Sequence, residues 1–325
     1  MSINAAAAPA SPSAIGGYFS LESRGRAPLH PDGLFVNSGR NALRMLVRHR
    51  AISHVHVPYF TCPVVWDALA AEGVTIAYYD LDDAMRPARS FAPDAWVLLN
   101  NSFGLLDRDV AAFAREHPRV IVDNAQALYS PAYGAGAIYS PRKFFGLPDG
   151  GILVADDLPV PPTEQDHSAG RIGHLARRAE DAPEAGFPEY TAHERALDDA
   201  PVRAMSAVTR ALFSTVPAQR AAQLRRENFA HLARRLGRHN LLDLPTPDVE
   251  VPLCYPLLGG GRALREALIA ARVFVPTFWP GVLEVAPPGS RSRRLAEDLV
   301  PLPIDQRYGA LEMDRVADLV ERHLG

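Results

Sequence analysis

The sequence predicts an α/β fold with a mostly parallel central sheet, helices on both faces of that sheet, and a small C-terminal α+β domain. Short β-branched apolar runs alternate with helical patterns between residues 39 and 154, which is typical of a parallel sheet covered on both sides. The chain has 325 residues, of which 47% are hydrophobic, enough for one large domain with a smaller one beside it.

The first predicted helix begins just after Gly39. Its apolar positions Leu43, Leu46 and Val47 follow helical spacing, and Ser38 or Asn37 is the expected cap. Further elements follow along the chain: strands at 55–57, 75–79, 96–99, 120–122 and 152–154, and helices at 64–71 and 110–116. This alternation predicts the large domain.

The second half of the chain changes character. Residues 159–188 are rich in Pro, Asp and Glu with little periodicity, so we expect an exposed connection over the active-site face. Residues 203–238 look helical and basic; we expect a solvated basic face and buried positions at Leu224, Phe229, Leu232 and Leu236. Strands at 251–255 and 273–275, a helix at 262–271 and a final amphipathic helix then predict the small domain.

These patterns divide the chain into four expected parts. We expect a flexible tail at 1–14, a large domain at 15–200, connecting helices at 201–240 and a small domain at 241–325.

Charge and cysteine content exclude several classes of protein. The 34 basic and 37 acidic residues are interspersed, so no nucleic-acid footprint is expected. Cys62 and Cys254 cannot build a disulfide framework or a multi-cysteine metal cluster, and they fit a reducing cytoplasm. We expect no metal, no signal peptide and no membrane span.

Lys143 is the strongest candidate for chemistry. It follows Tyr139-Ser140-Pro141-Arg142 and precedes Asp149-Gly150-Gly151, in a chain with very few lysines beside many arginines. Because a lysine amine can condense with an aldehyde cofactor, the segment indicates a Schiff-base lysine for pyridoxal phosphate (PLP). The alternative is a solvated surface lysine, which base rates favour for lysine in general.

Asp123 and Gln126 supply the polar groups that a PLP ring needs. Asp123 ends the predicted strand 120–122, and ligands bind beyond the carboxyl ends of parallel strands. A carboxylate there would keep the ring nitrogen protonated, and Gln126 could donate to the phenolic oxygen. Asp123 could equally be a helix cap, but the presence of Lys143 favours the catalytic interpretation.

The cofactor phosphate needs donors, and Ser38, Gly39 and Arg40 at a helix start offer backbone N–H groups, a hydroxyl and a favourable dipole. Ser140 could add a hydroxyl, although it could also shape the turn before Pro141. No zinc-protease motif follows His193-Glu194, and no dinucleotide, Walker or nucleophile-elbow motif occurs.

The order of these motifs resembles the DegT/DnrJ/StrS family of fold-type-I, PLP-dependent sugar aminotransferases, from about residue 16 to the C-terminus. Residues 38–43 are similar to its phosphate-binding segment and residues 57–62 to the segment that covers the cofactor ring, which makes Cys62 a cofactor-binding candidate. Residues 123–126 resemble its Asp-Ala-Ala-Gln motif, Lys143 with residues 149–151 its lysine and acidic-Gly-Gly turn, and residues 302–305 its "LPI" stretch.

The resemblance implies a cytoplasmic homodimer. It would transfer an amino group, expected to come from L-glutamate, to a keto group of a nucleotide-linked sugar in surface-polysaccharide (including lipopolysaccharide) or secondary-metabolite biosynthesis. Two rivals remain open: a PLP-fold protein that binds a cofactor or partner without turnover, and a PLP enzyme acting on a non-sugar substrate.

The chain departs from the family at several positions. Cys62 stands where many relatives carry a ring-stacking aromatic, which leaves Tyr59, Phe60 or Phe103 for that role. The asparagine that relatives send into the neighbouring subunit has no clear counterpart around Met205-Ser206. Arg142 and Arg171 are candidates for binding substrate anions.

Overall fold

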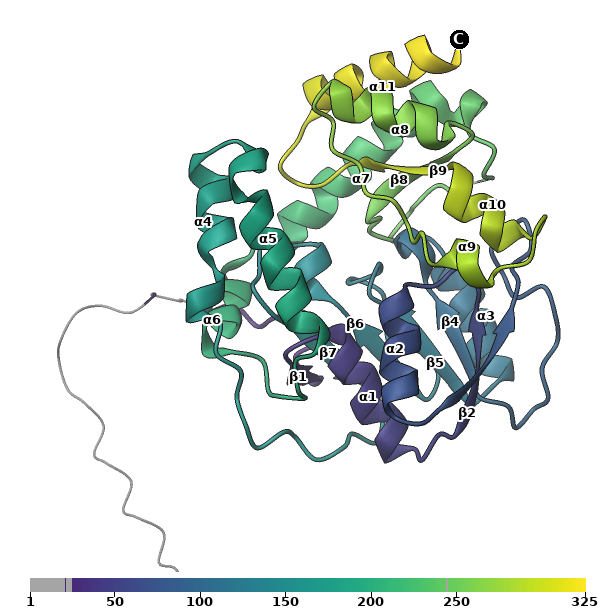
Figure 1. Ribbon diagram of the computed structural model, residues 1–325, viewed down its shortest axis with the longest axis vertical. Helices are drawn as coiled ribbons and strands as arrows, with labels where there is room; N and C mark the ends of the chain where they lie inside the picture. The colour runs from purple at the N-terminus through teal and green to yellow at the C-terminus, as the bar shows by residue number, and fades with distance from the viewer. Residues whose placement is uncertain (1–20, 22–24, 244) are drawn as a thin grey trace, which may run out of the picture.

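A seven-stranded sheet forms the centre of the large domain (Figure 1). The computed structural model describes residues 21, 25–243 and 245–325, so the tail expected at 1–14 lies outside the described residues. The strand order is β1-β7-β6-β5-β4-β2-β3, and within this sheet only β7 runs against its neighbours. The predicted mostly parallel α/β fold is confirmed.

The elements of the large domain agree closely with the prediction. Two short strands, β1 and β6, were not predicted. The elements are β1 (Leu34–Val36), α1 (Gly39–His49), β2 (His54–Pro58), α2 (Pro63–Ala71), β3 (Thr75–Tyr79), β4 (Val97–Asn100), the 3-10 turn η1 (Ser102–Gly104), α3 (Asp107–Glu116), β5 (Val120–Asn124), β6 (Gly136–Tyr139), η2 (Pro141–Lys143) and β7 (Gly151–Val154).

The central strands are buried on both faces of the sheet. Successive side chains point to opposite sides, and each side is covered by a separate apolar cluster. Leu98 and Ile121 pack in the cluster formed with α1 and α2. Val97, Leu99 and Val120 belong to a second cluster, which includes Val110 of α3 and extends into the small domain. The apolar runs seen in the sequence therefore fill the core on both sides of one sheet.

The connection expected at 159–188 is wrong in its second part. After the 3-10 turn η3 (Ala169–Arg171), the chain forms the helical hairpin α4 (Gly173–Glu180) and α5 (Pro183–Asp198), at the left of Figure 1. The buried positions of this hairpin are His174, Gly186, His193 and Leu197. Because histidine and glycine are not counted as apolar, the sequence shows no apolar spacing of helical period over these residues.

The connecting helices are present as α6 (Ala207–Thr215) and α7 (Ala218–Leu236), followed by the turn η4 (Gly237–His239). Phe229, Leu232 and Leu236 are buried as predicted. Leu224 is only half-buried. The division into domains near residues 200 and 240 remains a prediction.

The small domain is a two-stranded antiparallel sheet covered by helices. Its elements are β8 (Cys254–Leu258), α8 (Gly261–Ala270), α9 (Val282–Val285), α10 (Arg291–Asp298), β9 (Leu299–Pro303) and α11 (Ala310–Leu324). The predicted strand at 251–255 lies further along, at β8. The predicted strand at 273–275 is wrong: Val273 and Val275 are buried, but in the described chain this segment pairs with no strand, and β9 is the partner of β8.

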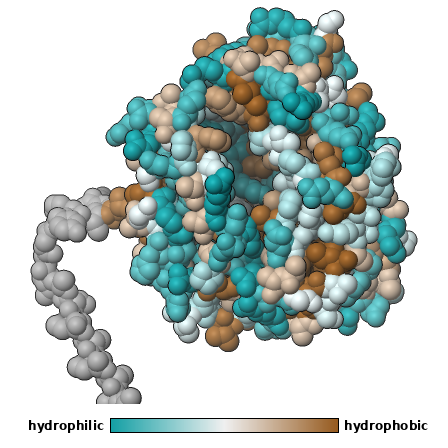
Figure 2. All heavy atoms as spheres, in the orientation of Figure 1, coloured by the Kyte–Doolittle hydropathy of each residue, from teal (hydrophilic) through white to brown (hydrophobic). Residues whose placement is uncertain are grey.

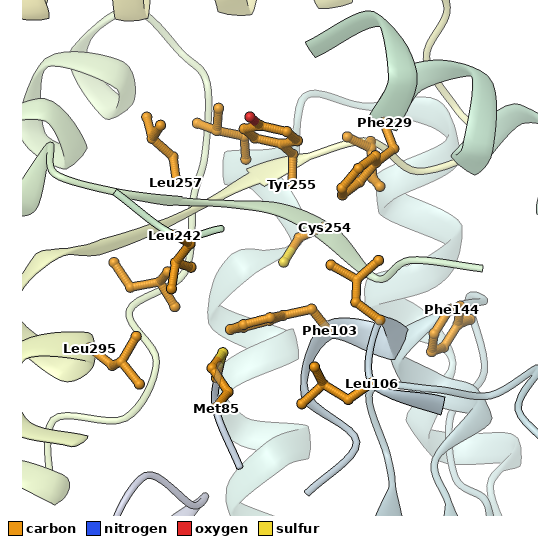
Figure 3. Packing of buried hydrophobic residues seen from close by; sticks show 14 of the residues in the cluster. Met85, Phe103, Leu106, Phe144, Phe229, Leu242, Cys254, Tyr255, Leu257 and Leu295 are labelled. Carbon is orange, nitrogen blue, oxygen red and sulfur yellow. The ribbon is translucent and has the colours of Figure 1, made fainter. Parts of the chain in front are cut away.

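One apolar core joins the large sheet to the predicted small domain. Figure 3 shows Phe103 of the large domain lying between Met85 and Leu106 on one side and Cys254 of β8 on the other. None of the described helices has the length and apolar character that a bilayer crossing requires.

One basic residue of α7 contradicts the expected solvated face. Arg225 is 2% exposed. Its guanidinium donates to the carbonyl oxygens of Leu253 at 2.9 Å and Phe144 at 3.4 Å and to Gln306 Oε1 at 3.0 Å, and it lies 4.7 Å from the centre of the Phe144 ring. The side chain therefore joins α7 to both domains.

Replacing Arg225 should destabilise the whole molecule. We expect Arg225→Met to lower the free energy of unfolding by about 3 kcal/mol, because buried carbonyl oxygens lose their donors. The exposed Arg234 on the same helix is the matched control, and Arg234→Met should change that free energy by less than about 0.5 kcal/mol. Urea unfolding measures both; equal effects would show that Arg225 has no special structural role.

Candidate functional site

Four residues that the sequence singled out share one cavity. Cys62, Asp123, Gln126 and Lys143 line it, together with Asn100, Asn101, Ala125 and Trp279. The cavity lies at the carboxyl ends of β4 and β5, where a parallel sheet binds ligands. The face drawn in Figure 1 is hollowed near its centre in the space-filling view (Figure 2).

Lys143 is the only lysine in the chain. It ends the short turn η2, in which its own N–H donates to the carbonyl of Ser140 at 3.2 Å. Its side chain is exposed and, among the described residues, makes no hydrogen bond or ion pair. The carbonyl of the next residue, Phe144, accepts from Gln306 Nε2 at 2.8 Å and from Arg225. The backbone is thus held while the amine is left available.

Asp123 stands on β5 beside this amine. One carboxylate oxygen accepts the N–H of Ala125 at 2.8 Å. Burial raises the pKa of the Asp123 carboxyl, and the charge of Lys143 and the Ala125 N–H oppose that increase. Burial disfavours the charged form of this carboxylate, and a cationic N–H partner would stabilise that form.

Two amide side chains in the cavity have unpaired atoms. Gln126 accepts the N–H of Phe103 at 2.8 Å through Oε1, while its Nε2 is buried without a partner in the described chain. Asn100 donates to the carbonyl of Phe60 at 2.8 Å and to Thr61 Oγ1 at 2.7 Å, and its Oδ1 is likewise unpaired. Buried polar atoms normally have partners, so this cavity is built to receive a polar ligand.

Three residues of the lining were not predicted: Asn100, Asn101 and Trp279. Asn100 and Asn101 could have been found, because they follow a predicted strand in the same way as Asp123 does. Trp279 comes from the small domain and carried no motif.

The start of α1 forms a second part of the site. The side chain of Ser38 caps the helix by accepting the N–H of Asn41 at 3.1 Å, and the first turn contains no acidic residue, so its dipole is uncompensated. Ser140 lies beside this helix start, since a Cβ on Gly39 would be 3.8 Å from Ser140 Cβ. Ser38, Gly39 and Ser140 are therefore neighbours, as an anion site would require.

The segment around Asp149 positions the helix start. A Cβ on Gly151 would lie only 2.2 Å from the carbonyl group of Ser38, so only glycine allows this approach. Asp149 is fully buried and accepts hydrogen bonds from Ser168 Oγ at 2.8 Å, from the N–H and Oγ of Ser206 at 2.9 and 2.7 Å, and from Thr209. Ser206 and Thr209 at the start of α6 thus anchor the turn after Lys143 through Asp149.

The arginines near the site are paired with acidic residues of the segment between β7 and α6. Arg40 directs its guanidinium to the end of α5, where it donates to the carbonyl of Leu197 at 3.0 Å and pairs with Asp198 at 2.8 Å. Arg142 pairs with Glu194 of α5, and Arg171 pairs with Asp166 at 2.8 Å. Only the backbone of Arg40 belongs to the helix start.

Cys62 completes the cavity as the cap residue of α2. Burial raises the pKa of its thiol, against the opposing charges of Lys143 and Arg40. The thiol therefore stays protonated at neutral pH and serves as a small apolar wall rather than as a nucleophile.

The contact between Gly151 and Ser38 can be tested directly. We expect Gly151→Ala to lower the free energy of unfolding by at least about 1–3 kcal/mol, because the added methyl group overlaps the backbone. Gly170 has open space around its Cβ position, so Gly170→Ala should cost less than about 0.5 kcal/mol. Chemical unfolding of the two variants measures the difference, and a harmless Gly151→Ala would mean that the helix start moves freely.

No protein-family model and no curated protein matches the sequence, but solved structures do. A DegT DnrJ EryC1 StrS aminotransferase from Brucella abortus is 16% identical with a TM-score of 0.62, covering 90% of this chain and 86% of that chain. Sugar aminotransferase CalS13 from Micromonospora echinospora is 19% identical, with a TM-score of 0.60 and coverage of 90% and 87%. The PLP form of Spr1654 from Streptococcus pneumoniae is 12% identical, with a TM-score of 0.61 and coverage of 90% and 88%. The chain therefore has the fold of the DegT/DnrJ/StrS aminotransferases, which is the fold that the sequence motifs predicted.

Proposed function

We propose that this protein is a PLP-dependent aminotransferase that acts on a keto sugar. The observation that carries the proposal is the shared cavity of Lys143, Asp123 and Gln126, in which the buried Nε2 of Gln126 has no partner among the described residues. The fold, seen in proteins that include a sugar aminotransferase and a PLP-form structure, supports the same conclusion.

The residues present fit the cofactor. Lys143 would bind its aldehyde carbon, Asp123 its ring nitrogen and Gln126 its phenolic oxygen. The helix start at Ser38, Gly39 and Arg40, with the hydroxyl of Ser140, would hold its phosphate. When bound, PLP supplies an electron sink that lets an amino group leave one carbon and join another.

Each side chain then has a separate task. Asp123 would hold a proton on the ring nitrogen, because a partly buried carboxylate is stabilised by an adjacent N–H cation. Lys143, whose backbone is held by the Phe144 carbonyl contacts, accepts a proton at Nζ from the substrate carbon and returns it to a neighbouring atom. Gln126 would orient the ring through the unpaired N–H groups of its Nε2.

The finer parts of the proposal rest on the family resemblance. We infer L-glutamate as amino donor, a nucleotide-linked keto sugar as acceptor, a homodimer, and a cytoplasmic role in surface-polysaccharide or secondary-metabolite biosynthesis. One observation favours testing the rivals, which are a PLP-fold protein without turnover and a PLP enzyme with a non-sugar substrate. Arg142 and Arg171, the candidates for binding substrate anions, are both paired with acids. A free arginine usually binds a substrate carboxylate, and these two are engaged.

The first test uses the single lysine. We expect PLP followed by borohydride to label the protein at Lys143, and L-glutamate added before reduction to prevent the labelling. Lys143→Ala and Lys143→Arg should both lose the label and lower turnover by at least about 10²–10⁴-fold, because arginine keeps the charge but is no nucleophile. Peptide mass spectrometry locates the label. Wild-type protein that binds no PLP would refute the proposal, and labelling that glutamate does not prevent would reject glutamate as donor.

The second test separates electronic from structural roles at β5. We expect Asp123→Asn to reduce turnover by about 10²-fold while cofactor affinity changes by less than about tenfold, because the amide no longer stabilises a protonated ring nitrogen. Single-turnover kinetics and equilibrium dialysis with PLP measure the two quantities. Parallel losses in both would assign Asp123 a structural role.

A further inference from the structure

An aromatic side chain from the small domain forms one wall of the cavity. Trp279 lies in the loop between the buried Val275 and α9, and it lines the cavity together with residues of the large domain, including Cys62, Asp123 and Lys143. The other wall residues all belong to the large domain.

The three aromatics that the sequence offered for ring stacking lie elsewhere. Tyr59 stacks on Tyr78, with ring centres 5.2 Å apart and planes 10° apart. Phe60 and Phe103 are 0% and 1% exposed, and Phe103 is enclosed in the core shared by the two domains (Figure 3). None of the three lines the cavity.

The position of Trp279 is imposed by its surroundings. Its ring centre lies 4.8 Å from that of Phe60 and 5.4 Å from that of Phe278. Its φ is 151°, in the region that favours glycine, which costs about 1–3 kcal/mol. Nearby, Gly281 approaches α2 so closely that a Cβ there would be 3.0 Å from Pro63 Cγ. This strained loop is therefore fixed against the residues that flank Cys62.

We propose that Trp279 supplies the aromatic surface that covers the cofactor ring, in place of the aromatic absent at Cys62. The inference rests on the proposed function. It follows from the pairing of a small thiol on the large domain with an indole on the small domain at the same cavity. Cofactor binding is thereby coupled to the position of the small domain.

The size of the cavity supports this coupling. Its volume is about 10 Å³, close to the room that one water molecule needs. Trp279 is the one wall residue that comes from the small domain, so the position of that domain sets the width of the cavity.

The test measures binding of pyridoxamine phosphate, which forms no covalent bond with Lys143. We expect Trp279→Ala to weaken its binding about tenfold, and Trp279→Phe to remain within about threefold of wild type, because an aromatic face is retained. Calorimetry gives the affinities. Equal affinity of Trp279→Ala and wild type overturns the inference, whereas a wild-type protein that does not bind overturns the proposed function itself.

A second measurement does not depend on the folding of Trp279→Ala. The chain has three tryptophans, at positions 66, 96 and 279. In a protein with Trp66→Phe and Trp96→Phe, saturating pyridoxamine phosphate should quench most of the emission of Trp279. The matched protein with Trp66→Phe and Trp279→Phe keeps only Trp96, which directly precedes β4 at the end away from Asn100. This protein should keep most of its emission. Equal quenching in the two proteins contradicts the placement of Trp279.

Discussion

The buried guanidinium of Arg225 is the interaction on which the arrangement of the two domains depends. Few charged side chains are fully buried, and a buried cation is stable only when its donors are satisfied. Here the acceptors are backbone carbonyls from both domains, Phe144 on one side and Pro252 and Leu253 on the other. Because Phe144 follows Lys143 directly, the bond that joins the domains also fixes the backbone at the reactive amine.

The site combines a rigid frame with a few unsatisfied groups. Asp149 and Gly151 make the frame, since the carboxylate binds the start of α6 and the glycine admits the start of α1. The lining contains the opposite kind of group: Gln126 and Asn100 each hold one atom in place and leave another unpaired. Such a division is expected of a site that binds a polar ligand, because rigid neighbours keep the free atoms in position.

The sequence was sufficient to predict the parallel sheet, apart from the short strands β1 and β6, and the centre of the site, because both depend on local patterns. Asp123 and Gln126 follow a strand, and Lys143 lies in a distinctive segment, so their meeting in one cavity could be expected. The α4–α5 hairpin could not, because three of its four buried residues are histidine or glycine. Arg225 looked like its solvated neighbours, and only tertiary contacts distinguish it. Trp279 reaches the cavity through domain packing, which no local pattern encodes.

The single lysine has a consequence for the selectivity of the chain toward aldehydes in general. Guanidinium groups stay protonated at any physiological pH and form no Schiff base with a simple aldehyde, whereas a lysine amine does so once it loses its proton. Of the lysine and arginine residues in the chain, all but Lys143 are arginine. The side chains therefore offer one ε-amine to reactive aldehydes, and that amine lies in the cavity. A reagent that reacts with lysine ε-amines is therefore a specific probe of this one cavity among the side chains of the chain.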